Sequence, residues 1–134
     1  MSKQFQTLTL SENYIETIQD NSFMYDRKIT SGCCSLLTEL DLSNNKLVTL
    51  SEAAFAGLYN LETLDLSGNR FRQVPTMALK SLEKLDILDM SNNPELQTIP
   101  NSAFSHNKGL VELRLQGCRL TSIDTGAFKS IGNY

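Results

Sequence analysis

The chain has 134 residues, which is enough for one domain with a sizeable core. Its 40% hydrophobic and 20% charged residues are ordinary for a folded protein, and the net charge of −3 argues against a general nucleic-acid binder, since such proteins usually carry a basic face. No run approaches the ~20 continuous apolar residues that cross a bilayer, and residues 1–7 hold no apolar segment of a signal peptide.

Five copies of one apolar pattern, L-x-x-L-x-L-x-x-N-x-L, follow one another along the chain. They start near residues 5, 37, 61, 85 and 110, about 24 residues apart except for a longer first gap. The second copy shows the complete pattern at Leu37, Leu40, Leu42, Asn45 and Leu47. Recurrence at this period indicates a repeat protein in which each copy forms one structural unit that stacks on the next.

Each copy contains an L-x-L segment, which predicts one short strand. Alternation turns the leucines inward and the residues between them outward, and strands of successive copies pair in a parallel sheet. The return segments, such as residues 51–54, favour short turns over long helices. Two more apolar columns recur there, the second expected to stack as a spine: Ile18, Leu50, Val74, Ile99 and Ile123, then Phe23, Phe55, Leu79, Phe104 and Phe128.

A polar residue closes each copy. The amide of an asparagine there is expected to bond backbone groups inside the turn, which would otherwise be buried without partners. In the fourth copy an inserted Pro94-Glu95 delays the next apolar residue to Leu96. In the fifth copy Cys118 replaces the asparagine, and we expect it to be a buried structural thiol.

These residues resemble the leucine-rich-repeat family, and more closely its 24-residue typical class, whose signature is almost intact from Leu37 to Phe55. The resemblance covers about residues 5–134. It implies an α/β fold, a right-handed solenoid of about five repeats, with a short-stranded parallel sheet on the concave face and a mostly irregular or 3-10 convex side, in a single domain of residues 1–134. Similar modules are mostly receptor ectodomains, matrix proteins and adhesion proteins that bind proteins on the concave face, while some bind glycans, lipids or nucleic acids.

Two features depart from that class. The cysteine-rich caps of extracellular members are missing, so the apolar interior of the end coils would be open to water. That favours a piece of a longer extracellular or cell-surface protein, or self-association through the uncapped ends. The first gap also carries an insertion at about residues 24–35, which maps to a loop. The three cysteines, Cys33, Cys34 and Cys118, are an odd number, which leaves their redox state open.

The residues between the leucines are the candidate ligand site. Over the outward positions of the five copies, eight acids and one base give a net charge of −7. Because the net charge of the chain is −3, the remaining residues carry a net charge of +4. Asp41, Asp65 and Asp89 form a ladder that either steers a basic protein surface or only solvates the face, and Ile87 and Val111 are candidate hot spots. A third column of serines and Gln116 is expected to face outward beside them. The predicted site is Glu39, Asp41, Thr63, Asp65, Ile87, Asp89, Glu112 and Arg114.

Basic side chains predict a second surface, along one lateral edge, for a glycan or another anionic ligand. They come after the closing Asn or Cys of their copies, and the alternative is that they are only solubilising charge. This lateral basic strip consists of Lys46, Arg70, Arg72 and Arg119.

No motif points to catalysis. The single histidine, His106, lies in a loop without a partner nucleophile. The spacing of acids and cysteines fits no metal site, and no phosphate or dinucleotide motif occurs, so we expect neither cofactor nor metal. The leading hypothesis is a protein-interaction module, not an enzyme, from a receptor, adhesion or matrix protein. The alternative is a structural spacer or a self-associating segment of a larger repeat protein.

Overall fold

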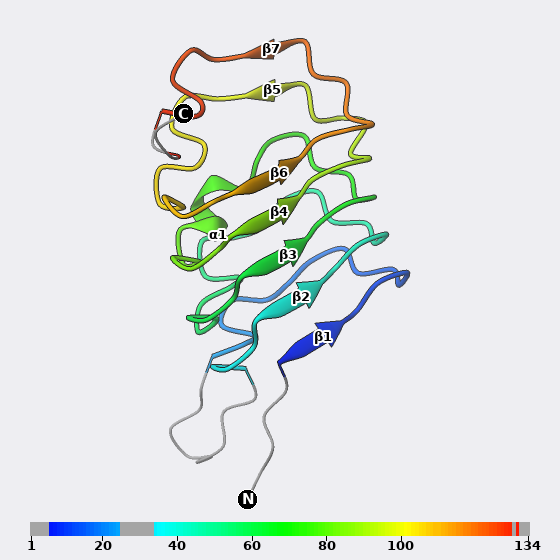
Figure 1. Cartoon of the computed structure of the whole chain (residues 1–134). Coiled ribbons are helices and arrows are strands. Elements are labelled where there is room, and N and C mark those ends of the chain that lie inside the picture. The colour runs from blue at the N-terminus through cyan, green and yellow to red at the C-terminus, as the bar shows by residue number, and fades with distance from the viewer. Residues whose placement is uncertain (1–5, 25–33, 130, 132–134) are drawn as a thin grey trace, which may run out of the picture.

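The computed structural model describes residues 6–24, 34–129 and 131. Its main sheet consists of five three-residue strands, all parallel, in the order β1-β2-β3-β4-β6. Figure 1 shows these strands side by side, each with a coil that leads to the next. Their bounds are Thr7–Thr9 for β1, Glu39–Asp41 for β2, Thr63–Asp65 for β3, Ile87–Asp89 for β4 and Glu112–Arg114 for β6. The solenoid and its parallel sheet are confirmed.

The leucine at the centre of each strand points into the coil. These leucines are in register across the sheet, from Leu8 through Leu40, Leu64 and Leu88 to Leu113. The three in the middle are fully buried, while Leu8 and Leu113 in the end coils are only partly buried. A leucine therefore needs a coil on each side to leave water completely, as expected for a solenoid in which each repeat contacts only its neighbours.

The return side of the coils contains little regular structure. Among the described residues it holds one short helix, α1 (Thr76–Leu79), which follows Pro75, and a second small sheet. That sheet pairs β5 (Thr98–Ile99) with β7 (Ser122–Ile123), and Figure 1 shows it at the C-terminal end of the solenoid. The absence of long helices was predicted. In the described part of the chain, no helix is long and apolar enough to span a membrane.

A ladder of asparagines joins successive coils. The Asn69 amide nitrogen donates to the carbonyls of Leu42 (3.0 Å), Leu66 (3.1 Å) and Ser67 (3.2 Å), and its Oδ1 accepts from the Leu47 amide (3.0 Å). Asn45 and Asn93 make the equivalent four bonds in their own coils. Each amide thus satisfies backbone groups of two coils, the role predicted for this position.

Cys118 takes the ladder position with a single bond, from its Sγ to the Met90 carbonyl at 3.2 Å. An asparagine at residue 118 would accept a hydrogen bond from the Leu96 amide. That amide instead donates to the Asn93 carbonyl (3.1 Å), across the residues inserted after Asn93. An acceptor is therefore not needed at residue 118. The structural role holds, but Cys118 is half-buried and not buried as predicted.

Cys34 comes just before β2, toward the opposite end of the solenoid from Cys118. Cys34 is buried and disulfide-bonded, whereas Cys118 is a free thiol. Cys33 lies outside the described residues, and so does most of the predicted insertion at residues 24–35, of which only Met24, Cys34 and Ser35 are described.

The predicted aromatic spine is interrupted. Phe23 and Phe55 lie 6.5 Å apart between ring centroids, and Phe104 and Phe128 stack at 6.2 Å. Leu79, at the end of α1, occupies the column between these two pairs. The column is buried in the middle of the solenoid, while Phe128 in the last coil is 41% exposed.

Candidate functional site

The outward side chains of the five main strands form two columns, which we call the sheet surface. The register aligns Glu39, Thr63, Ile87 and Glu112 with Thr7 in the first column. It aligns the members of the second column in the same way: Thr9, Asp41, Asp65, Asp89 and Arg114. All eight residues of the predicted site therefore lie on one face of one sheet, where neighbouring strands are about 4.8 Å apart.

The aspartates of the second column also hold the turns that follow their strands. Oδ1 of Asp65 accepts from the backbone amide of Ser67 (2.9 Å) and from its hydroxyl (2.6 Å), and Asp89 makes the same two bonds to Ser91. Asp41 accepts from the Ser43 amide at 2.9 Å. Side chains that bond the backbone two residues ahead stabilise such turns. The three aspartates therefore have a structural role, whether or not they also bind a partner.

The burial of the serines corrects the prediction for most of the third column, of which only Gln116 is exposed. Ser43 and Ser91 are buried, at 7% and 4% exposure, and Ser11 and Ser67 are half-buried. The Ser67 and Ser91 hydroxyls turn back to the aspartates of their own coils and do not face outward. The open surface is consequently two columns wide, flanked by the exposed acids Glu62 and Asp86.

Charge changes along the sheet surface. The acids of its middle strands give way to Arg114 on β6, whose guanidinium lies 2.6 Å from Glu112 and 3.7 Å from Asp89. Arg114 is 48% exposed at its side chain and Asp89 only 15%. The carboxylates that Arg114 does not pair with are those toward the N-terminal end, and they are the ones available to a cationic partner. Of these, Glu39 is exposed, and Asp41 and Asp65 are half-buried.

Two apolar side chains lie near Glu112, toward the C-terminal end of the sheet surface. Ile87 is half-buried within the first column, whereas Val111, just before β6, is 72% exposed. An exposed aliphatic beside charged groups suits a small apolar anchor of a partner, because its burial adds a favourable free energy that the acids alone do not supply.

The four residues of the predicted lateral basic strip have different neighbours. Arg72 is paired with Glu95 at 3.0 Å, while the Lys46 ammonium lies 5.0 Å from the centre of the Tyr14 ring. Lys46 and Arg70 border one shallow groove, and Arg72 borders two others. Lys46, Arg70 and Arg119 come directly after the closing Asn or Cys of their copies and Arg72 comes three residues after it, and the lateral basic strip stays a prediction.

Two polar residues were missed from the sequence. Tyr14 is 82% exposed and occupies the position directly after the closing asparagine, where Lys46 and Arg70 stand in later copies. Asn107 is 1% exposed and donates to the carbonyls of Leu79 and Leu82, both at 3.0 Å, so it satisfies carbonyls at and just after the end of α1. The sequence does mark Asn107, because it replaces the leucine that the two preceding copies have at this position.

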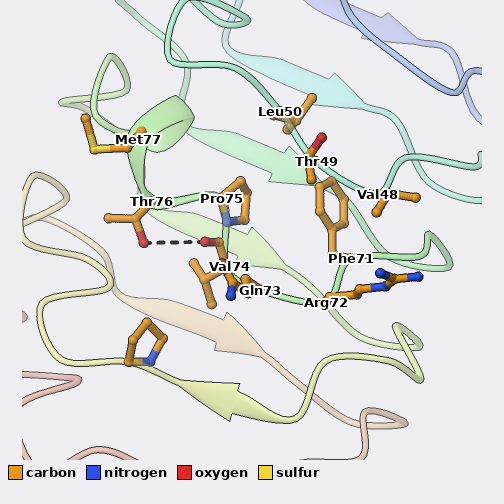
Figure 2. A pocket seen from close by; sticks show the side chains of 11 residues that line it. Val48, Thr49, Leu50, Phe71, Arg72, Gln73, Val74, Pro75, Thr76 and Met77 are labelled. Atoms are coloured by element: carbon orange, nitrogen blue, oxygen red, sulfur yellow. Dashed lines mark hydrogen bonds between the residues drawn. The ribbon is translucent and has the colours of Figure 1, made fainter.

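A groove of about 530 Å³ opens on the return side, between Val48–Leu50 of one coil and Phe71–Met77 of the next. Figure 2 shows its lining, with the Thr76 hydroxyl bonded to the Val74 carbonyl and Arg72 at one end. The lining contains no acid, histidine or cysteine, so it offers no pair of groups for acid–base or nucleophilic catalysis. Among the described residues, no group of three or more potential ligands could hold a metal ion.

Stacked parallel coils joined by an asparagine ladder define a leucine-rich-repeat protein. The chain belongs to this family: the family described as "Leucine rich repeat" matches residues 35–94 and 60–120. Repeats of this family are in general protein-interaction modules and typically not enzymes.

Individual relatives match parts of this chain. It is 46% identical over 50 residues to the protein Tsukushi of Xenopus tropicalis, a match that covers 37% of this chain and 12% of that protein. The crystal structure of a leucine-rich repeat protein from Bacteroides thetaiotaomicron superposes with a TM-score of 0.67 at 26% identity, over 82% of this chain and 14% of the bacterial one. The chain thus spans a small part of the length of either relative.

Proposed function

We propose that residues 1–134 act as one protein-binding domain, part of an extracellular receptor, adhesion or matrix protein, that holds a partner's basic surface against the sheet surface. The observation that carries this proposal is the register, which gathers Glu39, Asp41, Asp65 and Asp89 on one face. Carboxylates about 4.8 Å apart repel one another by on the order of 1 kcal/mol per pair even in water. A cationic partner relieves that repulsion, and such complementarity mainly raises the association rate and sets specificity.

The hydrogen bonds to the turns leave the aspartates of the second column able to bind a cationic partner. A carboxylate that accepts at Oδ1 keeps its charge and a second acceptor oxygen. The partner should therefore present lysine or arginine opposite the two columns and a small apolar group near Ile87 and Val111. Because the exposed charges act over about 8 to 10 Å at physiological ionic strength, binding should weaken as salt rises.

The first prediction tests this surface with exposed acids that hold no turn. Replacing Glu39 and Glu62 by Lys should weaken binding to an array of recombinant extracellular protein domains by roughly tenfold or more, measured by biolayer interferometry. Substituting the aspartates would confuse the result, because it would also break the turns at Ser43, Ser67 and Ser91.

The matched control carries the same change in charge elsewhere. Glu16 and Glu83 are exposed and lie off the sheet surface, so replacing both by Lys should leave the same partners bound. Partners that bind the two double variants equally well would place the site elsewhere.

A second candidate is an anionic glycan at the lateral edge. Tyr14, Lys46 and Arg70 border one shallow groove there, which combines an exposed ring with two bases. Retention on heparin that falls with salt, and that is lost on replacing Arg70 and Arg119 by Ala, would favour this edge over the sheet surface. Replacing the exposed Lys108 and Lys129 by Ala serves as the control.

A further inference from the structure

The turns that follow the strands of the middle coils border a polar groove of about 460 Å³. It crosses the coils of β2, β3 and β4, and its lining includes Lys46, Arg70 and Asn92. The buried ladder amides of Asn45 and Asn69 also line it, but their hydrogen bonds to the backbone already occupy them. The lining contains no aspartate or glutamate, although the chain has 15 acids and 12 lysines and arginines.

The two bases of this groove keep their charge for a ligand. Among the described residues, neither Lys46 nor Arg70 makes an ion pair, whereas Arg72, Lys80 and Arg114 each do. Lys46 and Arg70 directly follow the ladder asparagines of two neighbouring coils, whose backbones lie about 4.8 Å apart. An anion between two such cations is stabilised by both, and it also relieves their mutual repulsion.

Two side-chain amides at the mouth of the groove are also free to bind a ligand. Asn44 and Asn92 are exposed, and in the part of the chain that the structure describes their side chains make no hydrogen bond. A Cβ on Gly68 would collide with Oδ1 of Asn44, and one on Gly117 with Oδ1 of Asn92. Each amide oxygen therefore lies against the glycine of the next coil, and the amide nitrogen, which lies farther from that glycine, is free to donate.

The free groups of the groove are chiefly hydrogen-bond donors, and they come from three successive coils. A sulfate ester accepts from several directions at once, whereas a carboxylate confines its oxygens to one plane. Asn44 and Asn92 are two coils, or about 10 Å, apart, which is farther than one small anion reaches. The arrangement therefore suits a chain that carries repeated sulfate groups.

We propose that this groove binds a sulfated glycan that runs across the coils, with its sulfate esters held by Lys46, Arg70 and the amide nitrogens of Asn44 and Asn92. The proposal rests on the second candidate function, an anionic glycan at the lateral edge, and adds the class of glycan and the amides that select it. The rest of the lining offers only small apolar faces, such as Pro94, and no extended apolar surface for the acyl chain of a lipid.

The second prediction is that sulfate groups decide binding to this groove. A heparin oligosaccharide should bind the chain roughly tenfold or more tightly than hyaluronan of matched length, whose acidic groups are carboxylates, in isothermal titration calorimetry at fixed salt. Hyaluronan that binds as tightly as heparin would overturn the assignment to sulfate. Inorganic sulfate that binds as tightly as heparin would indicate a site for a small anion and would overturn the glycan.

Substitutions of Asn44 separate this site from a merely basic edge, which would also favour the more highly charged chain. Asn44→Gly removes the donor and tolerates the φ of 57°, as Gly68 does in the next coil, so heparin affinity should fall roughly three- to fivefold. Asn44→Asp keeps the shape but adds a negative charge, and it should lower the affinity roughly tenfold or more. Asn21→Asp is the matched control: Asn21 is also exposed and at positive φ (61°), but it lies on the return side, so the affinity should change less than about twofold.

The outcomes distinguish this proposal from the functions on which it builds. Heparin that does not bind the unaltered chain would overturn the glycan candidate and this proposal together, while the Glu39 and Glu62 variants still test the sheet surface. Heparin binding that is lost on replacing Arg70 and Arg119, but that responds equally to Asn44→Asp and Asn21→Asp, would overturn the amide-lined site alone. Thermal unfolding of the Asn44→Gly variant checks that its loss of affinity is not a loss of fold.

Discussion

At the scale of single residues, the hydrogen bonds of the asparagine ladder decide which positions can change. Asn69 is 3% exposed and makes four bonds to backbone groups of two coils. Cys118, in the same column, makes one bond and is half-buried. A buried polar group that loses its partner costs roughly 1–3 kcal/mol, which is more than a typical net hydrogen bond contributes.

The third prediction compares these two positions. Asn69→Leu should lower the free energy of unfolding by about 1–3 kcal/mol, because it leaves the Leu47 amide buried without a partner and removes one of the two side-chain donors to the Leu42 carbonyl. Cys118→Ala removes a weak donor and a half-buried thiol and should cost about 1 kcal/mol or less. Urea denaturation measures both, and equal losses would show that the ladder amide is not the stabilising group.

At the scale of the element, every strand of the main sheet is followed by a turn with one residue at positive φ. This residue is Glu12 (57°), Asn44 (57°), Gly68 (67°), Asn92 (56°) or Gly117 (77°). Asparagine and glycine tolerate this backbone conformation better than most residues, and Glu12 in the first copy is the exception. Residue 68 also lacks room for a side chain, because a Cβ on Gly68 would collide with Oδ1 of Asn44.

The fourth prediction follows from that contact. Gly68→Ala should destabilise the protein by about 1–3 kcal/mol, because the methyl group both strains the backbone and meets Asn44. Gly109→Ala is the matched control, since a Cβ there meets nothing within 4 Å, and it should change stability by less than about 0.5 kcal/mol. Thermal unfolding that gives the same shift for both would contradict this account of the turn.

At the scale of the whole molecule, burial decreases from the middle coils to the ends. The central leucines of β2, β3 and β4 (Leu40, Leu64 and Leu88) are fully buried, whereas those of β1 and β6 (Leu8 and Leu113) are only partly buried. The sheet surface changes along the same axis, from acids in the middle strands to Arg114 at β6. Because stability in a solenoid is approximately a sum over neighbouring coils, the end coils should open first.

The fifth prediction is a gradient of hydrogen exchange. The Leu10, Leu42, Leu66 and Met90 amides make equivalent bonds to the next coil. At low concentration, Leu42 and Leu66 should exchange more slowly than Leu10 and Met90, because opening an end coil exposes only the outer pair. Amides that all exchange at one rate would indicate a single cooperative unit.

The sequence by itself determined the five strands of the main sheet, their register, the inward leucines and the eight residues of the candidate surface, but not the small sheet of β5 and β7. It could do so because each feature recurs with the period of the repeat, and stacking identical units aligns equivalent positions. The same reasoning predicted the role of the ladder asparagines, since a polar residue at a fixed place in every buried turn needs hydrogen-bond partners, and the backbone of that turn supplies them.

The tertiary structure alone decided which partner each polar side chain takes. Ser43 and Ser91 are buried, Arg72 pairs with Glu95, and Asn107 bonds carbonyls of the preceding coil. A period shows which residues align, but a hydrogen bond or ion pair requires the distance between groups of neighbouring coils to be correct to within a few tenths of an ångström. Those distances exist only once the coils have stacked.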